Sequence, residues 1–143
     1  MANEYLNRNQ LPEAKAYFTV ITELSPRDPL AQNNLAWLLY KEGEIFQAQI
    51  HAELAYEAFP DSLMIVDTLG QILLDLGEYE KSKLMLRLAN KKMPDNLETK
   101  YYLAQAKAQG GDKATPRTLL KQILSQKILT TRRNTIYNVR AKY

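Results

Sequence analysis

The chain has 143 residues, 45% of them hydrophobic and 24% charged, and these proportions are typical of a globular protein with a substantial core. It has no cysteine, which excludes disulfides and thiolate metal sites, and its five glycines and six prolines are too few for the turns of an all-β fold. The formal net charge of +3 is uneven, because residues 1–120 carry 13 Lys/Arg and all 16 Asp/Glu, whereas residues 121–143 carry six bases and no acid.

A period of 34 residues runs through the chain without an insertion. Glycines, prolines and small or apolar residues each recur at this step, which indicates a repeat protein. The rows are Pro26/Pro60/Pro94, Asn9/Gly43/Gly77/Gly111, Ala14/Ala48/Ser82/Pro116, Phe18/Ala52/Leu86/Leu120, Ile21/Ala55/Ala89/Ile123, and Leu35-Ala36/Leu69-Gly70/Leu103-Ala104.

In chain order, the rows predict alternating first and second helices. Each first helix is expected to begin at a polar cap, at Asp28-Pro29, Asp61-Ser62 and Asp95-Asn96. It then ends at the next glycine of the glycine row, since glycine tolerates the left-handed backbone that often follows a helix. Each second helix runs towards the next proline, which cannot continue it. The small residues in the rows allow the two helices to approach closely.

This pattern resembles the tetratricopeptide repeat (TPR) family, whose 34-residue units have small residues at the eighth and twentieth places and a proline near the end. The resemblance implies an all-α fold, a right-handed superhelical solenoid of helix-turn-helix units. It covers residues 1–128: a repeat lacking its beginning at 1–28, complete repeats at 29–62 and 63–96, and a further one at 97–128. We expect this to be a fragment of a longer array.

Two strings resemble a narrower group within the family. Residues 33–38 (NNLAWL) and 67–73 (DTLGQIL) look like the C-terminal repeats of bacterial TPR proteins linked to exopolysaccharide export and exosortase-type sorting. That resemblance implies a role in a bacterial envelope system. No signal peptide or membrane-spanning run is visible, so the periplasm or envelope and the cytoplasm both stay open.

The basic C-terminal segment loses the period. Residues 129–143 are expected to form a capping helix or a mobile tail rather than another repeat. Its bases and tyrosines offer an alternative function, which is binding to a polyanion, including nucleic acid, or to an acidic membrane surface. We consider this reading less favoured than protein binding, because basic C-termini are commonly only solvated.

No residue pattern points to catalysis, a metal or a cofactor. His51 is the single histidine and lies inside a second helix, where a surface or packing role is the ordinary interpretation. Glu53 and Glu57 are i,i+4 neighbours on a helix face rather than an acid/base pair. Phosphate-binding loops and nucleophile elbows are absent from the sequence. We therefore expect a protein that is not an enzyme.

The resemblance implies a concave groove lined by the first helices of successive units. Amides there could pair with an extended peptide backbone, and aromatic side chains could serve as apolar anchors. The alternative for Trp37 and Tyr40 is packing between helices. The predicted groove residues are Asn33, Asn34, Trp37, Tyr40, Asp67, Gln71, Tyr101 and Gln105.

One known TPR binding mode is disfavoured by the sequence. Carboxylate-clamp members hold the acidic C-terminus of a chaperone with paired asparagines and several basic residues. Asn3 and Asn34 stand at the two asparagine places. The places of the basic residues hold Met64, Thr68, Glu98 and Tyr102 instead.

The sequence therefore predicts a protein-interaction scaffold that binds a peptide or helix in the groove, with no small-molecule substrate. Self-association through the open ends of the repeat array is an additional partner hypothesis that could coexist with this function.

Overall fold

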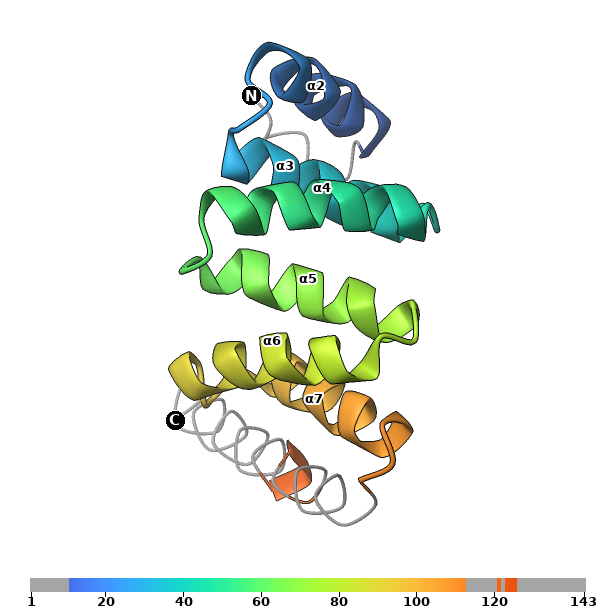
Figure 1. The fold of residues 1–143 in the computed structure, drawn as a ribbon, viewed down its shortest axis with the longest axis vertical. Coiled ribbons are helices and arrows are strands. Elements are labelled where there is room, and N and C mark those ends of the chain that lie inside the picture. Colours follow the sequence, from blue (N-terminus) through green and yellow to red (C-terminus); the bar gives the residue numbers. More distant parts are fainter. Residues whose placement is uncertain (1–10, 113–120, 122, 126–143) are drawn as a thin grey trace, which may run out of the picture.

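The structure is a computed structural model that describes residues 11–112, 121 and 123–125, and every described element is a helix (Figure 1). The predicted capping helix or tail at 129–143 lies outside these residues. The helices are α2 (Leu11–Leu24), α3 (Pro29–Lys41), α4 (Ile45–Ala58), α5 (Leu63–Asp75), α6 (Tyr79–Lys92) and α7 (Leu97–Gln109). The first helices α3, α5 and α7 begin 34 residues apart, and so do the second helices α2, α4 and α6. The predicted all-α solenoid is confirmed.

The caps and turns explain where the helices begin and end. Asp28 accepts hydrogen bonds from two backbone N–H groups at the start of α3, and Asn96 does the same for α7. Ser62 occupies the equivalent N-cap position before α5, as predicted, but its side chain makes no hydrogen bond to the backbone of the helix. Gly43 and Gly77 follow the ends of α3 and α5 with φ of +84° and +79°, a conformation that favours glycine.

The helices stack as a single file of units. Within a unit the first helix packs on the second, and each second helix packs on the first helix of the next unit. The first helices also contact one another, α3 with α5 and α5 with α7. In Figure 1, α4 lies in front of α3, and α6 lies in front of α7. The first helices therefore share one face of the array, and the second helices form the other.

Close approach within a unit depends on small side chains. Ala48 and Ser82 are fully buried, and the Ser82 hydroxyl donates to the Gly70 carbonyl oxygen at 2.7 Å. A methyl group added at Gly70 would lie 2.8 Å from Cγ of Leu86, which is itself fully buried. The same two places in the preceding unit hold Ala36 and Ala52, both fully buried. At least one of these two places thus holds a small residue in each of the two units.

No described helix combines the length with the apolar character that crossing a membrane requires.

The pairing of Gly70 with Leu86 predicts that the effect of Gly70→Ala on stability changes sign when Leu86 is replaced by alanine. Gly70→Ala should lower the free energy of unfolding, because overpacking against Leu86, roughly 1–3 kcal/mol, exceeds the gain of about 1 kcal/mol in helix propensity. In a Leu86→Ala background both contacts below 3.0 Å disappear. The remaining one, with Met85 Cβ at 3.3 Å, is relieved by a shift of a few tenths of an ångström, so Gly70→Ala should stabilise. Urea unfolding of the four proteins measures this coupling. Equal effects of Gly70→Ala in both backgrounds would contradict the packing described here.

Candidate binding groove

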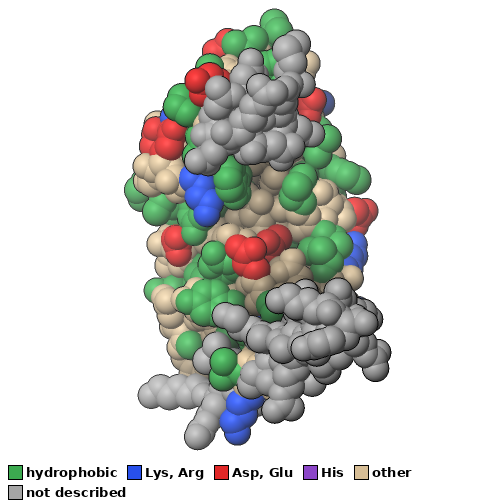
Figure 2. Space-filling view, turned by 180° about the vertical axis from the view of Figure 1, so that it is seen from behind, with side chains coloured by type: hydrophobic (Ala, Val, Ile, Leu, Met, Phe, Trp, Pro, Cys, Tyr) green, Lys and Arg blue, Asp and Glu red, His purple; other side chains and the backbone are tan. Residues whose placement is uncertain are grey.

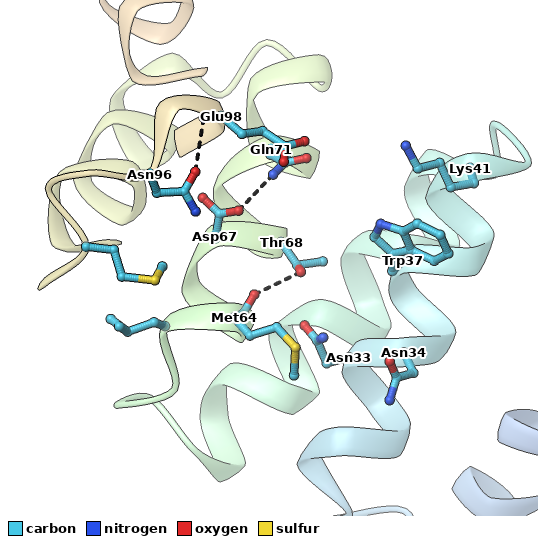
Figure 3. Close-up of a pocket in the computed structure, with 12 residues that line it drawn as sticks. Asn33, Asn34, Trp37, Lys41, Met64, Asp67, Thr68, Gln71, Asn96 and Glu98 are labelled. Atoms are coloured by element: carbon cyan, nitrogen blue, oxygen red, sulfur yellow. Dashed lines mark hydrogen bonds between the residues drawn. The ribbon is translucent and has the colours of Figure 1, made fainter. Parts of the chain in front are cut away.

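A groove of about 590 Å³ lies on the face formed by the first helices (Figure 3). Side chains from α3, α5, the turn before α7 and the first turn of α7 line it. The lining residues are Asn33, Asn34, Trp37, Lys41, Leu63, Met64, Asp67, Thr68, Gln71, Met93, Asn96 and Glu98.

Helix α3 supplies a buried amide and an exposed aromatic side chain. Asn33 is only 2% exposed, and its Oδ1 has no hydrogen-bond partner among the residues that the structure describes. A buried acceptor without a partner costs about 1–3 kcal/mol, so such groups are rare and call for an explanation. Trp37, one turn further, is 36% exposed, and the Lys41 ammonium lies 5.4 Å from the centre of its ring. This cation–π contact joins two side chains that both line the groove.

Helices α5 and α7 together hold a carboxylate in a fixed position. Asp67 accepts a hydrogen bond from the Gln71 amide at 2.9 Å and another from the Thr99 hydroxyl at 2.7 Å. Thr99 is fully buried, so this bond ties two successive units together at the groove wall. The Asn96 side-chain oxygen caps α7 at the same wall, and Glu98 stands exposed beside it. Asp67, Gln71 and Asn96 are thus held in position by contacts within the protein.

Among the described residues, the groove carries more acid than base. Asp67 and Glu98 line it, and within the same part of the chain Lys41 is the one basic lining residue. Asp75 lies on α5 two turns beyond Asp67 and accepts a hydrogen bond from the Tyr40 hydroxyl at 2.7 Å. Burial and this carboxylate raise the pKa of Tyr40. Figure 2 shows acidic side chains gathered in the middle of the face seen from behind.

The structure brings five of the eight predicted residues together at the groove: Asn33, Asn34, Trp37, Asp67 and Gln71. Tyr40 does not line it, because its hydroxyl is held by Asp75 and its ring packs against the core, which matches the packing alternative. Tyr101 and Gln105 pair with each other at 3.0 Å, outside the groove. Asn33 lines the groove as predicted in position, but its side chain is only 2% exposed, so it is buried at the groove wall rather than projecting into solvent.

Sequence reasoning did not find Leu63, Met93 and Asn96 as groove residues. Met93 is the residue at which α6 ends, and Asn96 caps α7, so both lie in the turn between units rather than on a first helix. For Met93 and Asn96, the signal in the sequence that could have found them is the proline row, since Pro94 lies in this turn just before α7.

The described residues contain no group of three side chains suited to hold a metal ion. His51 is partly buried on α4, and its Nδ1 lies 2.6 Å from the Gln32 side-chain oxygen on α3. The Gln32 amide nitrogen donates to the Pro26 carbonyl, so its oxygen faces the imidazole and accepts from it. His51 therefore joins the helices of one unit and does not line the groove.

No protein-family model matches the chain, and no curated protein matches it by sequence. Solved structures match it by shape. A MamA fragment from Desulfovibrio magneticus RS-1 superposes with a TM-score of 0.77 at 17% identity, covering 87% of this chain and 71% of that one. The TPR2B domain of yeast Sti1, in complex with pHsp70, superposes with a TM-score of 0.65 at 20% identity, covering 76% of this chain and 91% of that one.

A third similar structure is the first TPR of Spaghetti (RPAP3) bound to the HSP90 peptide SRMEEVD, with a TM-score of 0.68 at 19% identity and coverage of 75% and 85%. At these identities the likeness concerns the fold alone. The chain therefore has the fold of tetratricopeptide-repeat proteins.

The environment of His51 predicts how stability depends on pH. Burial lowers the pKa of His51 below its ordinary value, so the folded protein binds this proton less readily than the unfolded chain does. The contribution of His51 to the free energy of unfolding is then fully present above the pKa of the unfolded chain, about 6.5. It is lost as the pH falls through the lower pKa that His51 has in the folded protein. We expect the stability difference between wild type and His51→Asn to shrink from pH 7.5 to pH 5, measured by urea unfolding. A difference that does not change with pH would contradict this.

Proposed function

We propose that the chain is a protein-interaction scaffold, without catalytic activity, that binds a segment of another protein in the groove between α3, α5 and α7. The observation that carries the proposal is that side chains from three successive units converge on the groove. A site of this kind has the size and the mixed apolar and polar lining of ligand pockets. The extended shape of the array favours a polypeptide, which can run across the units.

The chemistry of the lining favours a segment with basic and apolar side chains. Trp37, Met64 and Met93 supply apolar contact surface, and Asn34 supplies an amide for a peptide backbone. Asp67 is already held by Gln71 and Thr99, so it needs no rearrangement to meet a cation. A partner with Lys or Arg at this point would gain a charge-assisted hydrogen bond.

An acidic peptide end does not suit the groove. The structurally similar RPAP3 domain binds SRMEEVD. In this chain Met64, Thr68 and Glu98 line the groove at places where clamp proteins carry cations. Glu98 in particular would repel a carboxylate. The likeness of fold therefore does not extend to the same ligand.

For the pathway, we propose a role in a bacterial envelope system that exports polysaccharide. The support is the resemblance of residues 33–38 and 67–73 to the C-terminal repeats of exopolysaccharide-associated TPR proteins. Deletion of the coding sequence in its host is expected to lower the amount of secreted polysaccharide, measured by sugar analysis of the medium. Unchanged secretion would remove this pathway while leaving the groove proposal intact.

The groove proposal predicts a specific loss of binding. Peptides selected from a displayed random library on the full chain should share a Lys or Arg. Asn34→Ala with Trp37→Ala should weaken the best of them at least about tenfold, since central aromatic contacts carry much of such binding energy. Isothermal titration calorimetry measures the affinity. Neither side chain is part of the buried core, so circular dichroism should show a folded variant.

The matched control is Phe46→Ala with Gln47→Ala, which removes an aromatic ring and an amide from the exposed side of α4. This control should bind the peptide as wild type does. SRMEEVD should bind more weakly than its counterpart with lysine at each acidic position. Equal losses in both double variants, or preferred binding of SRMEEVD, would refute the groove as described.

A further inference from the structure

Three carboxylates gather around one tyrosine of α7 on the face formed by the first helices. Asp67 and Glu98 line the groove, and Asp75 lies on α5 two turns beyond Asp67, outside the groove lining. Burial raises the pKa of Tyr102, and these three carboxylates raise it further, so they all lie near its side chain. Figure 2 shows acidic side chains together in the middle of the face seen from behind.

Asp67 and Asp75 are each held by a hydroxyl group from a neighbouring unit. Oδ1 of Asp67 accepts from Thr99 on α7 at 2.7 Å. Oδ2 of Asp75 accepts from Tyr40 on α3, also at 2.7 Å. Within the part of the chain that the structure describes, neither carboxylate forms an ion pair. An ionised carboxylate has about four acceptor positions, so both groups are fixed in place and can still accept donors from a cation.

The separation of the two carboxylates suits an extended peptide. Asp67 and Asp75 are eight residues apart on one helix, which corresponds to a rise of about 12 Å. Residues four apart on an extended chain are separated by about 13 Å and project to the same side. Two turns of a helix occupy about 850 Å³ if the helix is about 10 Å across with its side chains. The groove of about 590 Å³ therefore has more room for an extended segment than for a helix.

A buried acceptor in the same groove also points to a polypeptide ligand. Asn33 is 2% exposed, and its Oδ1 lacks a hydrogen-bond partner among the described residues. It lines the groove, and Figure 3 shows its side chain directed from α3 toward α5. A backbone N–H of a bound chain would give this oxygen a partner and remove the cost of leaving it unpaired. The groove thus offers an acceptor for a peptide backbone as well as carboxylates for its side chains.

We propose that this face recognises an extended segment of another protein that carries two basic side chains, with three residues between them. One Lys or Arg binds Asp67 in the groove, and the other binds Asp75, where α5 ends. The C-terminal end of a helix itself favours a cation, because the macrodipole is negative there. The inference rests on the groove function proposed above and adds to it a second contact outside the groove, a spacing and a conformation of the ligand.

A purely structural role for the two aspartates explains their hydrogen bonds but not their charge. Joining the units through Thr99 and Tyr40 requires acceptors, and the side-chain oxygen of an asparagine would accept the same hydrogen bonds. Among the described residues that line the groove, Lys41 is the one base, and its ammonium lies 5.4 Å from the centre of the Trp37 ring. Two cations on a partner would balance the charge that this face retains.

Displayed peptides test the spacing on the full, unmodified chain. The library carries two lysines separated by one to seven intervening residues, and its other positions are randomised without basic residues. Selection should enrich the peptides with three intervening residues, because this separation matches the distance between the carboxylates on one side of an extended chain. Equal recovery of every separation would overturn the proposal. So would enrichment at six or seven intervening residues, which is the separation expected for a helix.

Charge removal tests the two contacts one at a time. Asp67→Asn and Asp75→Asn keep an acceptor for Thr99 and Tyr40, and each should weaken the best peptide about tenfold in isothermal titration calorimetry. Replacing one lysine of the peptide by glutamine should cost about the same on the wild-type chain. It should cost nothing further on the variant whose aspartate that lysine contacts. The matched control Glu57→Gln removes an exposed carboxylate from α4 and should bind the peptide as wild type does.

The groove function and the two-cation contact fail in different ways. A peptide that loses affinity with Asn34→Ala and Trp37→Ala but not with Asp75→Asn would keep the groove and overturn the second contact. A selection that yields no peptide sensitive to the Asn34 and Trp37 variant would overturn both. Thermal melts check the fold of each variant, and the glutamine peptides measure the loss of each cation on the wild-type chain if an aspartate variant is unstable. Spermidine should not displace the peptide; displacement at a similar affinity would assign the carboxylates to a small polyamine and overturn the proposal.

Discussion

The structure depends on the close approach of two helices at small side chains within each unit. Where α5 carries Gly70, the partner helix carries the large Leu86, and where α3 carries Ala36, the partner carries Ala52. Interaxial distance follows the side chains at the contact, and in both units at least one of the two places holds a small residue, so the helices of a unit can approach closely. The stacked units place α3, α5 and α7 on one shared face, where each contacts the next. The groove is a consequence of that regularity.

The groove contains two kinds of polar group, which differ in how they are held. Asp67 is fixed by donors from its own helix and from α7, so its charge is positioned without cost at the moment of binding. Asn33 is buried, and the described part of the chain offers no partner for its oxygen, which costs stability in the free protein. Polar groups that are unsatisfied or preset in this way are common where a protein meets a ligand, and here both kinds lie on neighbouring helices of the same hollow.

Much of the fold follows from the sequence because its determinants are local. Helix ends depend on a cap such as Asp28 and on a glycine such as Gly43, and each acts within a few residues of its own position. The burial of Asn33 could not be predicted in the same way, because it depends on how closely α5 packs against α3. Tyr40 is a similar case, since its partner Asp75 lies 35 residues away and belongs to the next unit. Position in a repeat specifies which helix a side chain occupies, but the tilt between units decides whether it reaches solvent.

The repeat also provides an internal reference for separating packing from recognition. Positions that hold the units together keep their character from unit to unit, as Ala55 and Ala89 do, because every unit meets the same steric demand. Positions that face solvent are free of that demand, so differences there reflect other requirements. Glu53 and Arg87 stand at one such position with opposite charge, while the aliphatic neighbours beside them, Ile50 and Leu84, are retained and exposed. Solvation alone would not require aliphatic side chains at this place, so their recurrence is a feature of the outer face that helix packing within the chain does not explain.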